Sequence, residues 1–240
     1  MDPAAIERHN EQQREYFEAS TKRTMLPTDT PYIRRQVDEA VRFAGIRPGE
    51  RVLDVGCGMG RYTIPLALLG FRVEGMDIAP LLLDRLREFS AGRVEIPVHC
   101  ADVSRPPEAL EGTFDVVLGF FALHHVHDLD RCFAGMARLL RPGGRVVFVE
   151  PNPLNALYYL QIMLTPRMTW EGDRGILNMR PWRVFAAMRR AGLRSPEVRR
   201  FGFFPPFLAN RPWGPRAEAA LERVPLLGPV LPFQLFRAIR

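Results

Sequence analysis

The sequence has 240 residues, of which 47% are hydrophobic and 25% are charged, and these fractions are typical of a globular protein rather than a disordered, collagen-like or coiled-coil chain. The net charge of +6 is uneven, because residues 151–240 contain 14 arginines and five acidic residues, whereas the first 150 contain 19 basic and 22 acidic ones. An apolar run of about 18 residues is absent and the three cysteines are widely spaced, so we expect neither a membrane span nor a disulfide framework, and we predict a cytoplasmic protein.

The predicted elements begin with two helices, over residues 5–19 and 31–44. The second helix has apolar residues at helical spacing. Short apolar strands then alternate with helices. We predict strands over 51–55, 72–76, 94–100, 114–120 and 145–150, and helices over 61–69, 80–89 and 128–140. This alternation predicts an α/β fold with a doubly wound, mostly parallel, Rossmann-like sheet and helices on both faces.

The last third is less regular. We predict a helix over 181–191 and strands over 197–204 and 231–240. Prolines and aromatic residues crowd 203–215, so this stretch is expected to form a loop. No stretch with the composition of a linker divides the sequence into two domains.

A glycine turn carries the clearest functional signal. The segment VLDVGCGMGR (52–61) reads as a strand, a glycine-rich turn and the start of a helix. Glycine permits tight turns and lets a ligand approach the backbone, and a helix start favours an anionic group. A dinucleotide fingerprint would need a small residue at position 61, where the sequence has Arg61. NAD and FAD are therefore disfavoured, and no Walker A lysine follows.

Several segments resemble the class I S-adenosylmethionine-dependent methyltransferases. They are the glycine turn itself and the stretches VEGMDI (73–78), CADV (100–103), FDVV (114–117), ALHHV (122–126) and LLRPGGR (139–145), in the order of that family. The resemblance implies a seven-stranded sheet whose last strand is antiparallel. It also implies S-adenosylmethionine as cofactor and S-adenosylhomocysteine as product. The cofactor-binding residues that it implies are Asp54, Gly56, Cys57, Gly58, Gly60, Asp77, Ile78, Asp102, Val103, Phe120 and Tyr16.

Three acidic residues in this set have alternative structural roles. Asp77 follows Gly56 by 21 residues, which suits an acid that accepts hydrogen bonds from a ribose diol, but it could instead cap the following helix. Asp102 could bind the adenine amino group or cap a turn. Asp54 could bind backbone groups of the turn or the ammonium group of the cofactor.

The resemblance divides the chain into three parts of one domain. Residues 1–45 are expected to form a helical cap over the cofactor, 46–150 the cofactor-binding core, and 151–240 an acceptor-side lid with the final strands. Tyr158, Tyr159, Met163 and Trp170 in the third part are predicted to line an apolar acceptor pocket, although such residues also serve as ordinary core.

A histidine cluster follows the fourth predicted strand. His125, or otherwise His124, could remove a proton from a hydroxyl acceptor, or the pair could simply be packed and bonded to backbone groups. No metal site is expected, because no carboxylate or thiol stands at ligand spacing. Methyl transfer to oxygen, nitrogen or carbon of a small apolar or lipid-like acceptor is the predicted function.

Two other functions stay open from the sequence. The protein could be an enzyme of the same fold that catalyses a reaction other than methyl transfer. Alternatively, the basic last third could bind RNA or a membrane surface. Apolar segments at 203–208 and 224–232 are flanked by arginines and could contact an anionic membrane, or cover a sheet edge. We expect no DNA partner, no RNA partner, and a monomer or homodimer.

Overall fold

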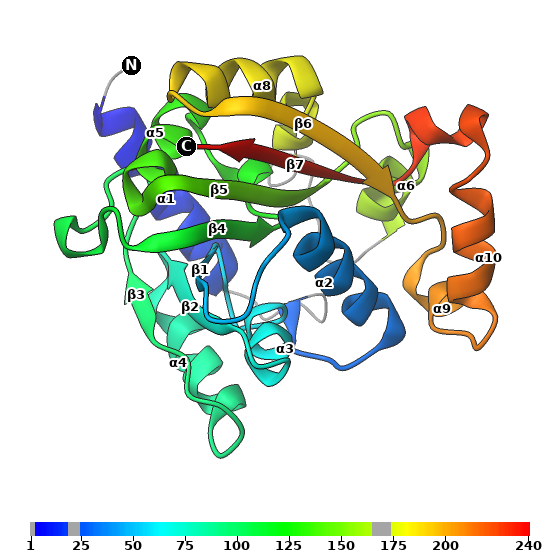
Figure 1. Ribbon diagram of the computed structural model, residues 1–240, viewed down its shortest axis with the longest axis horizontal. Helices are drawn as coiled ribbons and strands as arrows, with labels where there is room; N and C mark the ends of the chain where they lie inside the picture. Colours follow the sequence, from blue (N-terminus) through cyan, green and yellow to red (C-terminus); the bar gives the residue numbers. More distant parts are fainter. Residues whose placement is uncertain (1–2, 19–24, 165–173) are drawn as a thin grey trace.

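The computed structural model of the protein describes residues 3–18, 25–164 and 174–240. Within these residues, seven strands form one sheet in the order β3-β2-β1-β4-β5-β7-β6 (Figure 1). The strands are β1 (Arg51–Val55), β2 (Arg72–Asp77), β3 (Val98–Cys100), β4 (Phe114–Phe120), β5 (Leu140–Pro151), β6 (Arg194–Phe201) and β7 (Phe233–Ile239).

The sheet is parallel except for β7. Strands β1 to β5 pair in parallel, whereas β7 lies between β5 and β6 and is antiparallel to both. The predicted fold class is therefore confirmed, including the antiparallel last strand. The carboxyl ends of β1, β2 and β4 meet at one edge, which is where ligands bind in open α/β sheets.

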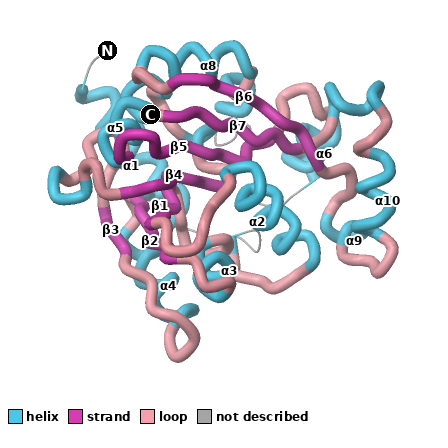
Figure 2. Tube along the Cα trace, in the orientation of Figure 1, coloured by secondary structure: helices cyan, strands magenta, loops and turns pink. Residues whose placement is uncertain are grey.

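Helices cover both faces of the sheet (Figures 1 and 2). On one face lie α2 (Pro31–Ala44), α3 (Thr63–Leu68) and α4 (Pro80–Ser90), and on the other α5 (Leu129–Leu139) and α8 (Pro181–Arg190). Neighbouring strand residues point to opposite faces, so Val116 of β4 packs toward α2 and Val117 toward α5. The described residues also form α1 (Pro3–Glu18), α6 (Ala156–Leu164), α9 (Pro206–Ala209) and α10 (Gly214–Leu221).

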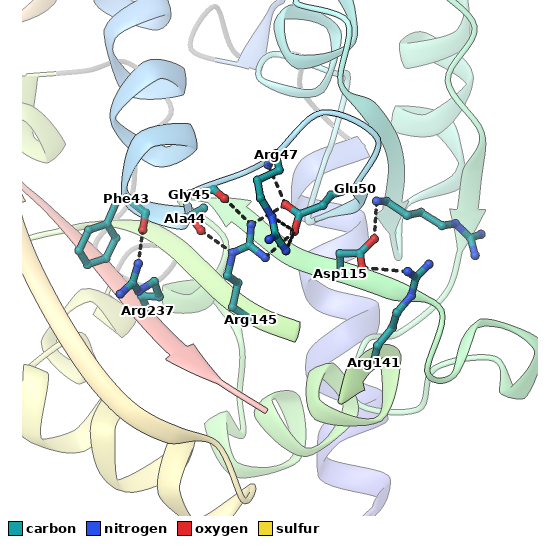
Figure 3. A network of polar contacts seen from close by, with 10 residues as sticks. Phe43, Ala44, Gly45, Arg47, Glu50, Asp115, Arg141, Arg145 and Arg237 are labelled. Carbon is teal, nitrogen blue, oxygen red and sulfur yellow. Dashed lines mark hydrogen bonds and ion pairs between the residues drawn. The ribbon is translucent and has the colours of Figure 1, made fainter. Parts of the chain in front are cut away.

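The C-terminal end of α2 is anchored to the sheet by arginines (Figure 3). Arg145 of β5 donates to the carbonyl oxygens of Ala44 and Gly45 and to Glu50, and Arg237 of β7 donates to the carbonyl oxygen of Phe43 at 2.8 Å. Burial alone would raise the pKa of Glu50, but the hydrogen bonds from arginine outweigh burial and lower it to about 2. Cations at a helix C-terminus satisfy its free carbonyls, so α2 is held in a fixed position beside the site.

Four sequence predictions are wrong in detail. The strand predicted over 145–150 begins earlier, as β5 at Leu140, and the strand predicted over 197–204 is shifted to Arg194–Phe201. The predicted loop over 203–215 contains α9 and the start of α10, because prolines occupy first-turn positions of both helices, where no N–H is needed. The predicted strand over 94–100 shrinks to β3, since Pro97 has no N–H to donate. In the described part of the chain, no helix is both long and apolar enough to cross a membrane.

Candidate active site

A cavity of about 360 Å³ lies at the carboxyl ends of β1, β2 and β4. Its wall combines the loops that follow these strands with residues of α1, the start of α2, α6 and β7. The cavity thus gathers residues from nearly the whole length of the chain. The wall includes both the glycine turn and several aromatic rings.

The glycine turn has the backbone geometry that the sequence predicts. Gly56 and Gly58 have φ angles of 72° and 50°, in the left-handed region that favours glycine. The N–H groups of Gly56 and Cys57 both donate to the carbonyl oxygen of Met76, which folds the turn onto the end of β2. A Cβ atom on Gly56 would lie 2.6 Å from the Cβ of Ala122, so only glycine fits between the two loops.

Asp77 presents its carboxylate to the cavity at the end of β2. Oδ2 accepts from the N–H of Gly58 at 2.8 Å and Oδ1 accepts from the N–H of Ala79 at 3.0 Å. Burial raises the pKa of Asp77, although these N–H groups oppose the shift. Ala79 is itself the N-cap residue of α4, so Asp77 does not cap that helix. The carboxylate is fixed at a strand end, as a ribose-binding acid must be.

Asp54 lies behind this wall rather than in it. Its side chain is buried in β1, and Oδ2 accepts from the hydroxyl of Thr63 at 2.6 Å. Burial raises the pKa of Asp54 to about 7, the hydrogen bond from Thr63 opposes the shift, and the charge of Asp77 adds to it. The predicted contact with the cofactor ammonium stays a prediction.

Asp102 has the turn-capping role considered for it and also lines the cavity, while its contact with the adenine amino group stays a prediction. Its carboxylate accepts from the N–H and the hydroxyl of Ser104, each at 2.8 Å, which closes a turn. It also lines the cavity, and the side-chain amide of Asn10 on α1 donates to it at 2.8 Å. Helix α1 is thereby held against the mouth of the cavity.

The histidine pair lies in the 3-10 helix η3 (Leu123–His125), and both rings line the cavity. Nδ1 of His124 lies 2.6 Å from Oε2 of Glu150, which is fully buried at the end of β5. The ring of His125 contacts Phe17 of α1 edge-on, with centroids 4.9 Å apart. Over the ranges described, no group of three or more side chains could hold a metal ion.

Aromatic rings form another part of the cavity wall. Tyr62 and Phe120 stack with centroids 4.2 Å apart, and Phe121 contacts Phe233 edge-on at 5.5 Å. Phe121 has a φ angle of 55°, which is uncommon for a residue other than glycine. Tyr32 also lines the cavity, and burial raises its pKa to about 12. This wall suits an apolar, flat ligand.

Most of the predicted site residues meet in this cavity. Its wall includes Gly56, Cys57, Gly58, Asp77, Ile78, Asp102, Val103, Phe120, His124, His125 and Tyr158. Gly60 instead packs against Ile64 and Leu86, which fixes the turn to α3 and α4. Tyr16, Tyr159 and Met163 are described but do not contribute to the wall, and Met163 is 74% exposed. Trp170 lies outside the described residues.

Several wall residues were missed by the sequence reasoning. Asn10, Gln13 and Phe17 share one face of α1, a spacing that could have been noticed once Tyr16 was chosen. Phe233 gives no local signal, because its place in the wall depends on how β7 pairs with β5. Glu150, which contacts the loop after β4 from outside the wall, depends in the same way on how β5 pairs with β4.

Comparisons with known proteins agree with this geometry. A family model described as a methyltransferase domain matches residues 53–148. A ubiquinone biosynthesis O-methyltransferase of Aromatoleum aromaticum is 31% identical over 208 residues, which cover 82% of this chain and 85% of that protein. The chain belongs to the class I S-adenosylmethionine-dependent methyltransferases. Methyl transfer from S-adenosylmethionine, as the family resemblance implied, is its activity.

Solved structures share the fold of this methyltransferase. A possible histamine N-methyltransferase of Thermotoga maritima aligns with a TM-score of 0.59 at 15% identity, over 98% of this chain and 97% of that one. A Haemonchus contortus phosphoethanolamine N-methyltransferase, in complex with S-adenosylhomocysteine, aligns with a TM-score of 0.67 at 16% identity, over 95% of this chain and 60% of that one.

The residues present fit S-adenosylmethionine. A Cβ atom on Gly58 would meet nothing within 4 Å, so the turn has space beside it for the methionyl part, and the fixed carboxylate of Asp77 could accept from the ribose hydroxyls. Acidic residues at Asp77 and Asp102 also suit a cofactor that carries positive charge on sulfur and nitrogen.

Proposed function

We propose that this methyltransferase methylates a hydroxyl oxygen of a small, apolar, lipid-like acceptor that carries a flat ring. The aromatic part of the cavity wall, formed by Tyr62, Phe120, Phe121 and Phe233, is the observation that carries the proposal. The relatives named ubiquinone biosynthesis O-methyltransferase, at 31–34% identity, support oxygen as the attacked atom.

The residues of the chain contribute alignment, exclusion of water and removal of a proton. When bound, S-adenosylmethionine supplies an electrophilic methyl group on a positively charged sulfur. The aromatic wall holds the acceptor ring and keeps water away from the hydroxyl group, and α1 closes the opening through its contact between Asn10 and Asp102. A phenolic hydroxyl has a pKa of about 10, so a base is needed near neutral pH, and His124 or His125 is in position to act as that base.

The proposal is tested by offering matched acceptors. The purified protein is incubated with S-adenosylmethionine and either 4-butylphenol or 4-butylaniline, and products are identified by mass spectrometry. We expect the phenol to gain one methyl group on oxygen, and the D77N variant to form far less product at limiting cofactor. Methylation of the aniline alone, or of a ring carbon, would refute oxygen as the acceptor atom.

We further propose that the basic last third contacts an anionic membrane from which a lipid-like acceptor could enter. Phe207, Trp213 and Leu226 on α9, at the N-cap of α10 and on η5 (Pro225–Val230) are 70%, 51% and 87% exposed. Exposed apolar side chains in an arginine-rich region suit such a surface. The expected absence of nucleic-acid partners, the compartment, the oligomeric state and the three-part division of the chain stay predictions.

A further inference from the structure

Arg61 places a positive charge in the cavity wall, between the glycine turn and α3. Nη1 of its guanidinium donates to the carbonyl oxygen of Leu26 at 2.9 Å, and Cζ lies 5.9 Å from the ring centroid of Tyr62. Both of these partners are uncharged, and Arg61 forms no ion pair with any residue that the structure describes. Within the described chain, no acidic group in contact with this guanidinium balances its charge.

Two other arginines show the usual arrangement. Arg131 also lines the cavity, but its Nε lies 3.7 Å from Oδ2 of Asp128. Arg35 of α2 donates to Glu218 of α10 at 2.6 Å. Removing an ion from water costs free energy unless a group of opposite charge is near, and the few polar groups of a ligand pocket are the ones that orient its ligand. An arginine without an acidic partner in a cavity wall therefore indicates an anionic ligand.

Two further polar side chains accompany Arg61 at the start of α2. Tyr32 lines the cavity, and its N–H donates to Oδ1 of Asn210 at 2.9 Å, which fixes its position. One turn along α2, Gln36 is only 2% exposed, and its Oε1 accepts from the hydroxyl of Tyr62 at 2.7 Å. The other end of this amide, Nε2, makes no hydrogen bond of normal geometry to a described residue. A buried donor in this state is uncommon and needs an acceptor nearby.

The three side chains lie close enough to influence one another. Burial raises the pKa of Tyr32 to about 12, while Gln36 and the charge of Arg61 oppose the shift. A donor and a cation have this effect only near the phenolic oxygen. A phenolic oxygen that faces a donor directs its own O–H toward another acceptor. Arg61, Tyr32 and Gln36, which we call the donor cluster, therefore offer donors to one region of the cavity.

A carboxylate matches the donor cluster better than other anions. Because Nη1 of Arg61 binds Leu26, the edge formed by Nε and Nη2 is the one that can bind both oxygens of a carboxylate. A phosphate group carries about two negative charges and would need more cations. In the described part of the wall the other guanidinium is that of Arg131, which already has an acidic partner. A ligand with a single negative charge is therefore favoured.

We propose that Arg61 and Tyr32 bind a carboxylate carried by the acceptor, so that the substrate class is a hydroxylated aromatic acid. This inference rests on the proposed transfer to oxygen. The donor cluster adjoins the aromatic part of the wall, since Tyr62 stacks on Phe120 and Tyr32 contacts Phe233 edge-on at 6.1 Å. An acceptor ring held on these side chains has its carboxylate at Arg61 and its hydroxyl group directed to the methyl group of the cofactor.

The first test measures acceptor binding without turnover. 4-Hydroxybenzoate, 3-hydroxybenzoate and 3-(4-hydroxyphenyl)propanoate are titrated calorimetrically into the S-adenosylhomocysteine complex, each beside its uncharged carboxamide. These acids differ in the separation between carboxylate and hydroxyl. We expect at least one acid to bind about 10–100-fold more tightly than its amide, as for hydrogen bonds to a charged group. In R61M this preference should fall below about threefold, and in Y32F it should take an intermediate value.

Two variants serve as controls for the loss in R61M. R61K keeps the positive charge without the planar fork, so its preference for the acid should lie between those of the wild type and R61M. R131M removes the cavity-wall arginine that already has an acidic partner, and its preference should stay within about twofold of the wild type. An equal loss in R131M and R61M would overturn the proposal, because it would indicate an effect of overall charge.

The second test asks whether Arg61 instead binds the carboxylate of the cofactor. S-adenosylhomocysteine carries a carboxylate in its amino-acid part, whereas 5′-methylthioadenosine lacks that part. We expect R61M to change the affinity for both compounds by less than about threefold in calorimetry. A loss of about tenfold or more for S-adenosylhomocysteine alone would overturn the proposal, because Arg61 would then serve the cofactor.

The outcomes separate this inference from the proposed function. Equal affinity of every acid and its amide for the wild type would overturn the carboxylate site, even if 4-butylphenol is methylated on oxygen. Transfer to the carboxylate oxygen of an acid would also overturn it, since the carboxylate would then lie at the methyl group. Preferential binding of an acid without methylation of any phenolic hydroxyl would instead refute the proposed function and keep the site.

Discussion

The contact between the glycine turn and the loop after β4 can be tested by adding one methyl group. In G56A the new Cβ would lie 2.6 Å from the Cβ of Ala122, whereas carbon atoms in contact normally stay about 3.5–4.0 Å apart. One of the two loops must therefore move by about 1 Å. G58A is the matched control, because Gly58 also has a positive φ angle but a Cβ there would meet nothing within 4 Å.

The expected loss of stability differs between G56A and G58A. A left-handed conformation costs a residue with a Cβ atom about 1–2 kcal/mol, and this cost applies to both variants. Overpacking adds about 1–3 kcal/mol in G56A alone. Because the clash is with a single methyl group, A122G in the G56A background should recover the overpacking part and leave the backbone cost.

Urea denaturation gives the free energy of unfolding of the four proteins G56A, G58A, A122G and G56A/A122G, and calorimetry gives their affinity for S-adenosylhomocysteine. We expect G56A to be the least stable single variant and the weakest binder, with a coupling energy to A122G of about 1–3 kcal/mol. Equal effects of G56A and G58A, or no recovery in the double variant, would show that the two loops do not touch as described.

Four further outcomes are expected. Replacing Asp77 by Asn removes charge-assisted acceptors of about 1.5–3 kcal/mol each, so calorimetry should show affinity for S-adenosylhomocysteine weakened by about 100-fold. The pKa of Asp54 is about 7 in the folded protein, whereas its ordinary value is 3.8. Ionising Asp54 therefore lowers the free energy of unfolding by about 4 kcal/mol. The unfolding free energy of the wild type should therefore fall relative to D54N as the pH rises from about 4 to 7, as measured by urea denaturation; a constant difference would contradict this. F233A should raise KM for 4-butylphenol by about tenfold in steady-state assays, with unchanged affinity for S-adenosylhomocysteine. Exchanging Phe207 and Leu226 together for Ser should reduce cosedimentation with phosphatidylglycerol vesicles, and equal binding to phosphatidylcholine vesicles would argue against an anionic surface.

The sequence was sufficient wherever local chemistry dictates structure. The run from Val52 to Gly60 specifies a buried strand and a turn that needs positive φ angles, and the spacing from Gly56 to Asp77 places an acid at the next strand end. These features depend on residues close together in the chain, so the cofactor side of the cavity could be predicted. The antiparallel last strand came from the family resemblance rather than from the residues themselves.

The acceptor side depends on long-range pairing and was harder to predict. Phe233 reaches the site because β7 pairs with β5, with Pro151 opposite Phe233, and Glu150 reaches it because β5 pairs with β4, with Val149 opposite Phe120. Phe121 looks like the continuation of an apolar strand, yet it has a left-handed φ angle, and the N–H groups of the next two residues donate to Glu150. The short helices α9 and α10 were not predicted, because proline usually interrupts a helix and is tolerated only in the first turn, where it lies in both.

The insertion of β7 between β5 and β6 has a consequence for biosynthesis of the protein. During translation, β6 has no hydrogen-bonding neighbour in the sheet until residues 233–239 have left the ribosome, since its described partner is β7 alone. A nascent chain that stops earlier exposes an open edge of β5, which invites association with other unfinished chains. The pairing of β7 with β5 and β6 therefore completes the cavity wall and buries this edge of β5 at the same time.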